Sequence, residues 1–218
     1  MDITPNISKN PCSSKLHIIF SLCCFLQCLI DFAQTKQIDS LKNILPLLKD
    51  TSRIDCLNEL SFQYTRLLIR DSAEYFESVA YNEAEKINYV HGVAESISNQ
   101  SGIVEYFDND FPKSEMLANQ SIGLFKKTSN KKGIEKTYNN LLFAIFSESK
   151  FDEAFPVAVW LYRKYKLDKD SSGMHNELAG IGTIYFQKGN YDSAFYFLKQ
   201  AQDISLANKT MWVYQMIC

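Results

Sequence analysis

The feature that most constrains this chain is a segment that recurs about every 40 residues. The stretch GNYDSAFYFLKQA at 189–201 aligns with SKFDEAFPVAVWL at 149–161, with NDFPKSEMLANQS at 109–121 and with IRDSAEYFESVA at 69–80. In this alignment the small residues Ala194, Ala154, Ser114 and Ala73 share one position. A second marker, the glycines at 92, 133 and 173, keeps the same spacing and is expected to close each unit. Two independent markers with one period predict a repeat that occurs four times.

Each unit is expected to form two helices. In the last copy, apolar residues recur at helical spacing before a Gly189-Asn190 break, and small or apolar residues follow it at the same spacing: Leu178, Ile181, Ile184 and Tyr185, then Ala194, Leu198 and Ala201. The glycine is the residue that a helix end favours. Pro112 and Pro156 are expected in the first turns of the second helices, where a missing N–H removes no helical hydrogen bond.

The spacing of these residues resembles the tetratricopeptide repeat (TPR). Ile181-Gly182-x2-Tyr185 is followed by Ala194-x3-Leu198-x2-Ala201, and the first copy has Leu60-Ser61-x2-Tyr64 with Ala73. The second and third copies depart from this pattern, with Glu105 where tyrosine is usual and Leu142 in place of glycine. The period is longer than the usual ~34 residues. The resemblance implies an all-α, right-handed superhelical solenoid of antiparallel helix pairs, similar to the exported N-terminal arrays of Gram-negative sensor kinases and regulators.

The period divides the chain into segments. We expect a capping helix and linker over 34–51, with a bend before Pro46, and four repeats at about 52–92, 93–133, 134–173 and 174–208. Residues 209–218 resemble the start of an incomplete fifth repeat and carry the apolar Trp212, Val213, Met216 and Ile217. A solenoid needs a polar cap at each end. The interpretation we favour is a truncated member of a longer family, and the alternative is an oligomer that buries this end.

The N-terminus has the pattern of a secretory signal. Lys9 and Lys15 precede an apolar run over 16–30, and the small residue Ala33 follows it. We predict a signal peptide over 1–33, cleavage that leaves Gln34 first, and a periplasmic or secreted protein. An uncleaved membrane anchor is the alternative, although the run is shorter than the ~20 residues of a spanning helix. Of six cysteines, Cys56 and Cys218 would remain, which is no disulfide framework.

Composition excludes several functions. The chain is 46% hydrophobic with a net charge of −2, so it has the balance of a globular protein without the basic excess of a nucleic-acid-binding one. It contains no His-Glu-x2-His, no paired cysteines in the mature part and no glycine-rich phosphate loop. We therefore expect no enzymatic activity, no metal and no cofactor.

The first helix of each repeat is expected to line a concave groove that binds a peptide or protein segment. Residues at equivalent positions form three rows, in which amides lie beside aromatic side chains. The expected groove residues are Asn58, Phe62, Asn99, Ile103, Tyr106, Asn139, Phe143, Phe146 and Phe186. Two alternatives remain open: the asparagines bridge neighbouring helices, and the aromatic residues fill the core between repeats. A second hypothesis for function is a sensory input domain of a histidine kinase or transcriptional regulator.

Overall fold

The computed structural model describes residues 35–207, which fall into two units that meet between Leu48 and Lys49. In the first unit a helix over 35–44 is followed by a short 3-10 helix, η1 (Leu45–Leu47), which contains Pro46. The bend predicted before this proline and the capping role of this segment stay predictions. The proposed signal peptide, Cys218 and the proposed fifth repeat lie outside the described residues.

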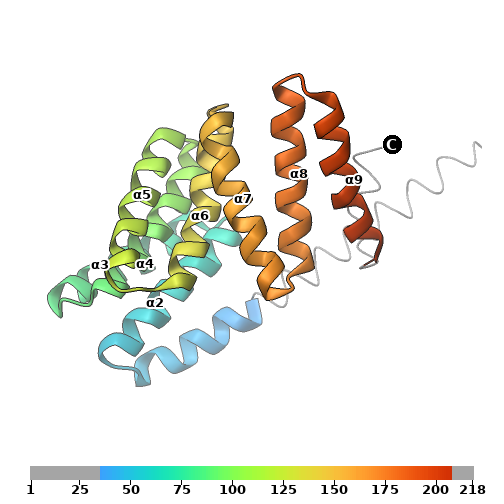
Figure 1. Ribbon diagram of the computed structural model, residues 1–218. Helices are drawn as coiled ribbons and strands as arrows, with labels where there is room; N and C mark the ends of the chain where they lie inside the picture. The colour runs from blue at the N-terminus through green and yellow to red at the C-terminus, as the bar shows by residue number, and fades with distance from the viewer. Residues whose placement is uncertain (1–34, 208–218) are drawn as a thin grey trace, which may run out of the picture. The chain divides into compact units, whose positions relative to one another are not determined.

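The second unit contains four consecutive helix pairs (Figure 1). They are α2 (Asp50–Arg66) with α3 (Arg70–Lys86), α4 (Val90–Ile103) with α5 (Phe111–Lys127), α6 (Lys131–Ser147) with α7 (Phe151–Asp168), and α8 (Ser171–Gln187) with α9 (Tyr191–Ala207). The predicted fold class, an all-α TPR-like solenoid of antiparallel helix pairs, is confirmed. Within residues 35–207, no helix combines the length and the hydropathy that a membrane span needs.

From the sequence, the three marker glycines were expected to close the repeats. They lie instead in the first turn of the first helix of the following repeat. Gly92, Gly133 and Gly173 are each buried under an aromatic ring. A Cβ at any of them would meet the ring of Tyr89, Phe125 or Tyr165 at under 3.0 Å. The period of these glycines therefore reflects close packing of a ring on the backbone and not the need for a flexible turn.

Most of the helix ends use a residue other than glycine in the left-handed conformation. Positive φ angles of 53–59° occur at the residues that end successive helices: Leu68, Asn88, Asn109, Ser129, Ser149 and Lys169. Gly189, with φ of 75°, is the glycine in this role. Chain-reversing hydrogen bonds such as Ile69 N–H to Tyr64 O at 2.9 Å recur at these ends and satisfy helix carbonyls. A search of the sequence for glycine at the turns would therefore locate one of these seven helix ends.

The two prolines have different positions. Pro112 is in the first turn of α5, as expected. Pro156 is the sixth residue of α7, so the expectation that it falls among the unpaired N–H groups is wrong. Because proline has no N–H, the carbonyl of Asp152 loses its donor within the helix.

The first helix of the second repeat ends in a wider turn. Residues Val104–Asp108 form a π-helical segment, η2, that continues α4 directly. Gly92 and Glu105 are 13 positions apart, whereas Gly133 and Ile145, at equivalent places in the third repeat, are 12 apart. A π turn holds one more residue than an α turn. The second repeat therefore absorbs an extra residue in η2, which shifts the alignment of repeats by one position across this segment.

Stacked rings join the two helices of the first and the last repeat. Tyr64 and Phe76 stack with centroids 5.5 Å apart and planes at 5°. Tyr185 and Phe197 stack at 5.4 Å and 3°. These are equivalent positions of the repeat, which supports the register inferred from the sequence. A core cluster joins α5, α6, α7 and α8 and includes Ala118, Ile122, Leu141, Ile145, Ala154 and Ile184.

Candidate protein-binding face

The first helices of the repeats define one face of the second unit. Helix α4 packs against both α2 and α6, whereas the second helices α3, α5 and α7 do not pack closely on one another. We call the exposed side of α2, α4 and α6 the inner face. It is the side on which the groove was predicted.

A row of amides joins these helices beneath the inner face. Asn99 Nδ2 donates to the backbone oxygen of Asn58 at 2.8 Å, and Asn140 Nδ2 donates to the backbone oxygen of Ser98 at 2.9 Å. Two hydroxyl bonds accompany them at equivalent places: Ser96 Oγ to Asn58 Oδ1 at 2.9 Å, and Thr137 Oγ1 to Ser98 Oγ at 3.0 Å. The same pair of bonds thus occurs at the α2–α4 and the α4–α6 junctions, and we call this set the inner seam.

The inner seam corrects part of the predicted groove. Asn58, Asn99 and Ile103 are 1%, 4% and 3% exposed, so a ligand on the surface cannot reach them. The asparagines bridge neighbouring helices, which was the alternative interpretation. The reason is the cost of leaving a buried amide or carbonyl without a partner, since a helix-to-helix bond satisfies both.

The register of the predicted asparagine row was also wrong by one residue. Because the extra residue of the second repeat lies in η2, beyond Asn99, the equivalent of Asn99 is Asn140 and not Asn139. Asn139 is exposed, and its Nδ2 donates to the Tyr165 hydroxyl at 3.0 Å. Asn140 was missed. The spacing of 41 between Gly92 and Gly133 was the sequence signal that could have found it.

The inner seam stops at the third junction. Gly180 stands where Asn140 does in the preceding repeat, and Glu177 stands where Thr137 does. Among the residues that the structure describes, no hydrogen bond or ion pair joins α6 to α8. The last repeat is attached mainly through α7, where Phe155 packs edge-on against Tyr185 at 5.6 Å.

Four of the predicted aromatic residues remain available at the surface. Tyr106 and Phe143 are 54% and 50% exposed, and their rings lie 6.3 Å apart at 22° across two adjacent repeats. Phe186 is 55% exposed, and Phe62 is half-buried. Phe146 instead packs edge-on against Phe151 at 5.5 Å and belongs to the core cluster. The predicted aromatic positions are therefore mixed: Phe146 lies in the core, and the other four are at least partly exposed.

A charged group adjoins the Phe62 ring. Lys136 Nζ lies 4.3 Å from the ring centroid, donates a hydrogen bond to Asn99 Oδ1 at 3.1 Å and is ion-paired with Glu95. Arg66 lies over the same ring at 5.8 Å. A ring between two cations is a favourable site for each of them. We call Phe62, Tyr106, Lys136, Asn139 and Phe143 the aromatic strip.

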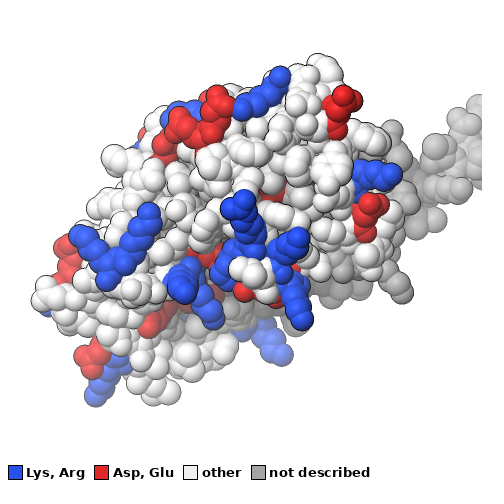
Figure 2. Space-filling model, viewed as in Figure 1, with Lys and Arg blue, Asp and Glu red and all other residues white. Residues whose placement is uncertain are grey.

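Basic side chains gather near one end of this strip. Figure 2 shows Lys and Arg over the lower parts of α6 and α7, with few acidic side chains among them. Lys131 and Lys132, at the start of α6, are exposed. Lys164 is the exception, because it pairs with Glu135 at 3.2 Å and with Asp168. The overall charge of −2 thus conceals a local basic excess.

Three buried glutamates have raised pKa values. Burial raises the pKa of Glu105 to about 8, against a weak Ser114 hydrogen bond at 3.4 Å, and raises that of Glu177 to about 7. Burial, and secondarily the charge of Glu74, raise the pKa of Glu77 to about 7. Burial also raises the pKa of the Cys56 thiol, so its reactive thiolate is disfavoured. No group of three or more metal-ligating side chains occurs among residues 35–207.

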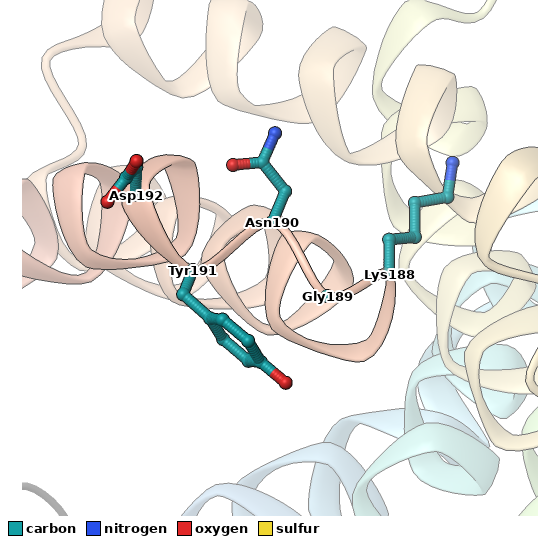
Figure 3. A pocket seen from close by; sticks show the side chains of 5 residues that line it. All are labelled: Lys188, Gly189, Asn190, Tyr191 and Asp192. Atoms are coloured by element: carbon teal, nitrogen blue, oxygen red, sulfur yellow. The ribbon is translucent and has the colours of Figure 1, made fainter.

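A shallow hollow at the α8–α9 turn does not form a site. It is lined by the consecutive residues Lys188–Asp192 (Figure 3). The side chains of Asn190 and Asp192 point to one side of the turn, and that of Tyr191 points to the other. Asn190 Oδ1 is used in a hydrogen bond from Ser193 N–H at 3.1 Å, and Lys188 pairs with Asp152. Diverging side chains with partners of their own offer no shared point for a ligand.

Comparisons with known proteins place the fold. Neither a family model nor a curated protein sequence matches the chain. Among solved structures, BtubC (BKLC) from P. vanneervenii is similar with a TM-score of 0.67 and 16% identity, over 84% of this chain and 77% of that one. Aspartyl phosphate phosphatase F from Bacillus subtilis is similar with a TM-score of 0.67 and 12% identity, over 97% of this chain and 60% of that one.

A third similar structure bears on the repeat type. It is a signal transduction ATPase with numerous domains (STAND) that has a tetratricopeptide repeat sensor, from Pyrococcus horikoshii. The TM-score is 0.65 at 14% identity, and the likeness covers 79% of this chain and 27% of that one. At such identities the likeness concerns the fold. The geometry and the comparisons together show that the chain has a TPR-like helical repeat fold.

Proposed function

We propose that this protein is a non-catalytic scaffold that binds an extended protein segment along the inner face. The observation that carries the proposal is the exposed stack of Tyr106 on Phe143, which spans two repeats beside Lys136 and Phe62. Large rings held in place by neighbouring helices are typical anchors of protein interfaces. The inner seam supports this role, because it fixes the spacing of α2, α4 and α6 and so the spacing of the rings they carry.

The charges near the strip favour an acidic partner. Lys132 precedes Lys136 by one turn of α6, so both lie on the same side of that helix. The basic group over α6 and α7 in Figure 2 extends from there. Opposite charge accelerates association and sets orientation more than it adds affinity. We therefore expect aromatic slots to select apolar side chains and the lysines to prefer flanking Asp or Glu.

A random peptide display library tests the proposal. Peptides enriched on the full chain should lose at least tenfold in affinity with Tyr106→Ala or Phe143→Ala, which remove ring contacts of about 1.5–3 kcal/mol each. Tyr75→Ala is the matched control, because Tyr75 is 61% exposed on α3, away from the strip. Enriched peptides that bind all three variants equally, or no enrichment at all, would contradict the proposal.

A second candidate is a sensory input domain, in which ligand binding alters a signalling module elsewhere in a longer protein. It is supported by the likeness to a STAND protein with a tetratricopeptide repeat sensor. Both candidate functions include the predicted export of the protein by a signal peptide over residues 1–33. Mass spectrometry of the protein recovered from its native compartment should find an N-terminus at or near Gln34, and an intact Met1 would contradict export by cleavage.

A further inference from the structure

A second hollow lies away from the aromatic strip, between α3, α4 and α5. Its volume is about 390 Å³, within the range of sites that take small ligands. Helix α3 contributes Glu77, Ser78, Tyr81 and Asn82, and the amides of Gln100 and Gln120 face it from α4 and α5. Ile97, also part of the lining, is 3% exposed and belongs to an apolar core cluster beneath it.

The carboxyl group in this hollow is unusual for its position in the repeat. The equivalent residues of the other three repeats are Ala118, Ala158 and Leu198. Glu77 is 8% exposed, and none of the described residues donates a hydrogen bond to it or pairs with its charge. A carboxyl buried without a partner costs free energy. The packing of the repeat does not require this residue, because alanine serves at two of the equivalent places.

The other oxygen atoms of the hollow are placed to accept hydrogen bonds. The Ser78 hydroxyl donates to the backbone oxygen of Tyr75 at 3.1 Å, and the Tyr81 hydroxyl donates to Glu85 Oε1 at 2.9 Å. With these protons already used, both hydroxyl oxygens are left as acceptors. Glu85 adds a negative charge beside Tyr81, and Glu74, which is ion-paired with Arg70 at 2.7 Å, contributes to the raised pKa of Glu77. A positively charged group with several hydrogen-bond donors would complement these acceptor oxygens.

We propose that this hollow binds a primary ammonium group, carried by a small amine or by a lysine side chain of a protein partner. An ammonium group offers three N–H donors in a compact head. Glu77 would supply the opposite charge, the Ser78 and Tyr81 oxygens and the side-chain amides the remaining acceptors, and Ile97 an apolar contact for the alkyl chain. The site is distinct from the aromatic strip and does not depend on the function proposed for it.

Calorimetric titration of the full chain with n-pentylamine at pH 8 tests this site. Glu77→Gln keeps the shape of the side chain and removes its charge, so binding should weaken at least tenfold. Glu177→Gln is the matched control, because Glu177 is also buried, at 6% exposure, but lies on α8. Binding that is unchanged in Glu77→Gln, or equally lost in Glu177→Gln, would overturn the proposal, as would equal binding of 1-pentanol.

Two further measurements complete the test. If Glu77→Gln does not fold, NMR of the unmodified chain decides, because n-pentylamine should shift the side-chain amide signals of Gln100 and Gln120, and unshifted signals would refute the site. Nα-acetyl-lysine methylamide distinguishes the two sources of the ammonium group. Affinity equal to that of n-pentylamine supports a lysine side chain of a protein, and binding of n-pentylamine alone supports a small amine.

Discussion

The first and the second repeat solve the same packing problem with different chemistry. Where the first repeat buries Tyr64, Ala73 and Ala80 between its helices, the second buries Glu105, Ser114 and Ser121. The fourth repeat follows the first, with Tyr185, Ala194 and Ala201 at these places. One hydrogen bond is common to both repeats, from Ser61 Oγ to Ala73 O at 2.9 Å in the first and from Ser101 Oγ to Ser114 O at 3.0 Å in the second. The second repeat adds a bond from Ser121 Oγ to Ala94 O at 2.7 Å.

The difference shows which property of the repeat is essential. Two of the three substitutions exchange alanine for serine, which keeps the side chain small. The third replaces the Tyr64 ring by Glu105, and the helix there adopts the π turn of η2. Close approach of the two helices is thus kept in both repeats, while the polarity of their contact is free to change. We expect the polar contact to make the second repeat the one whose stability responds most strongly to pH above 7.

The largest effect is expected in the apolar repeat. Tyr64→Ala removes a ring that is 7% exposed and stacked on Phe76, and should lower the free energy of unfolding by about 3–5 kcal/mol. Urea denaturation followed by circular dichroism measures this loss. Phe195→Ala, which removes a ring that is 70% exposed on α9, is the control and should change stability by less than about 0.5 kcal/mol. A loss below about 1 kcal/mol for Tyr64→Ala would show that the stack does not hold the first repeat together.

A smaller effect is expected from pH in the second repeat. Because an unfolded glutamate ionises near 4.5 and folded Glu105 holds its proton to about pH 8, its contribution is complete at low pH and is lost as pH rises through this window. Between pH 7 and 8 stability should fall by up to about 1.4 kcal/mol. Thermal melts across this range measure the slope.

Two glutamine variants separate the buried carboxyls in this titration. Glu105→Gln should remove the larger part of the slope between pH 7 and 8, and Glu77 and Glu177, whose pKa values are about 7, account for the rest. Glu177→Gln should have a smaller effect on this slope and a larger one on the decline at lower pH. A Glu105→Gln variant with the same slope as the unmodified chain would mean that Glu105 is ionised in the folded state at neutral pH.

The smallest effect is expected from restoring the repeat's alanine in the second repeat. Ser114→Ala leaves the Ser101 hydroxyl its bond to the backbone oxygen of residue 114 and removes a weak donor to Glu105. We expect a loss of about 1 kcal/mol or less in urea denaturation. Stabilisation instead would indicate that alanine is simply the better residue here and that the serine is tolerated.

Much of the fold could be predicted because it depends on local signals. The period of Ala73, Ser114, Ala154 and Ala194 predicted the helix pairs, and every helix of the second unit occurs within that period. The helix ends were less predictable, since residues such as Leu68 and Lys169 adopt the left-handed conformation without a glycine to announce it. Pro156 was misplaced for the same reason, because the start of α7 is set by the turn before it.

The candidate sites depended on information that a period does not contain. The asparagines of the inner seam share a residue type with the exposed Asn139, and only the position of the extra residue in η2 separates them. The exposed stack of Tyr106 on Phe143 was found because both rings lie on predicted rows. The hollow around Glu77 was not predicted, because its lining comes from three helices. The feature that marks it, a buried carboxyl without a partner, is visible only in the folded structure.

Gly180 has a mechanical consequence. An array of repeats under load behaves as a series of springs, and the weakest coupling between neighbours takes up most of the deformation. The first three repeats are tied through the inner seam as well as through their second helices, so they should move as one stiff body. At the third junction the seam is missing, and resistance comes from packing between α7 and α8, such as Phe155 on Tyr185. Force applied across the array should therefore bend it first between the third and fourth repeats.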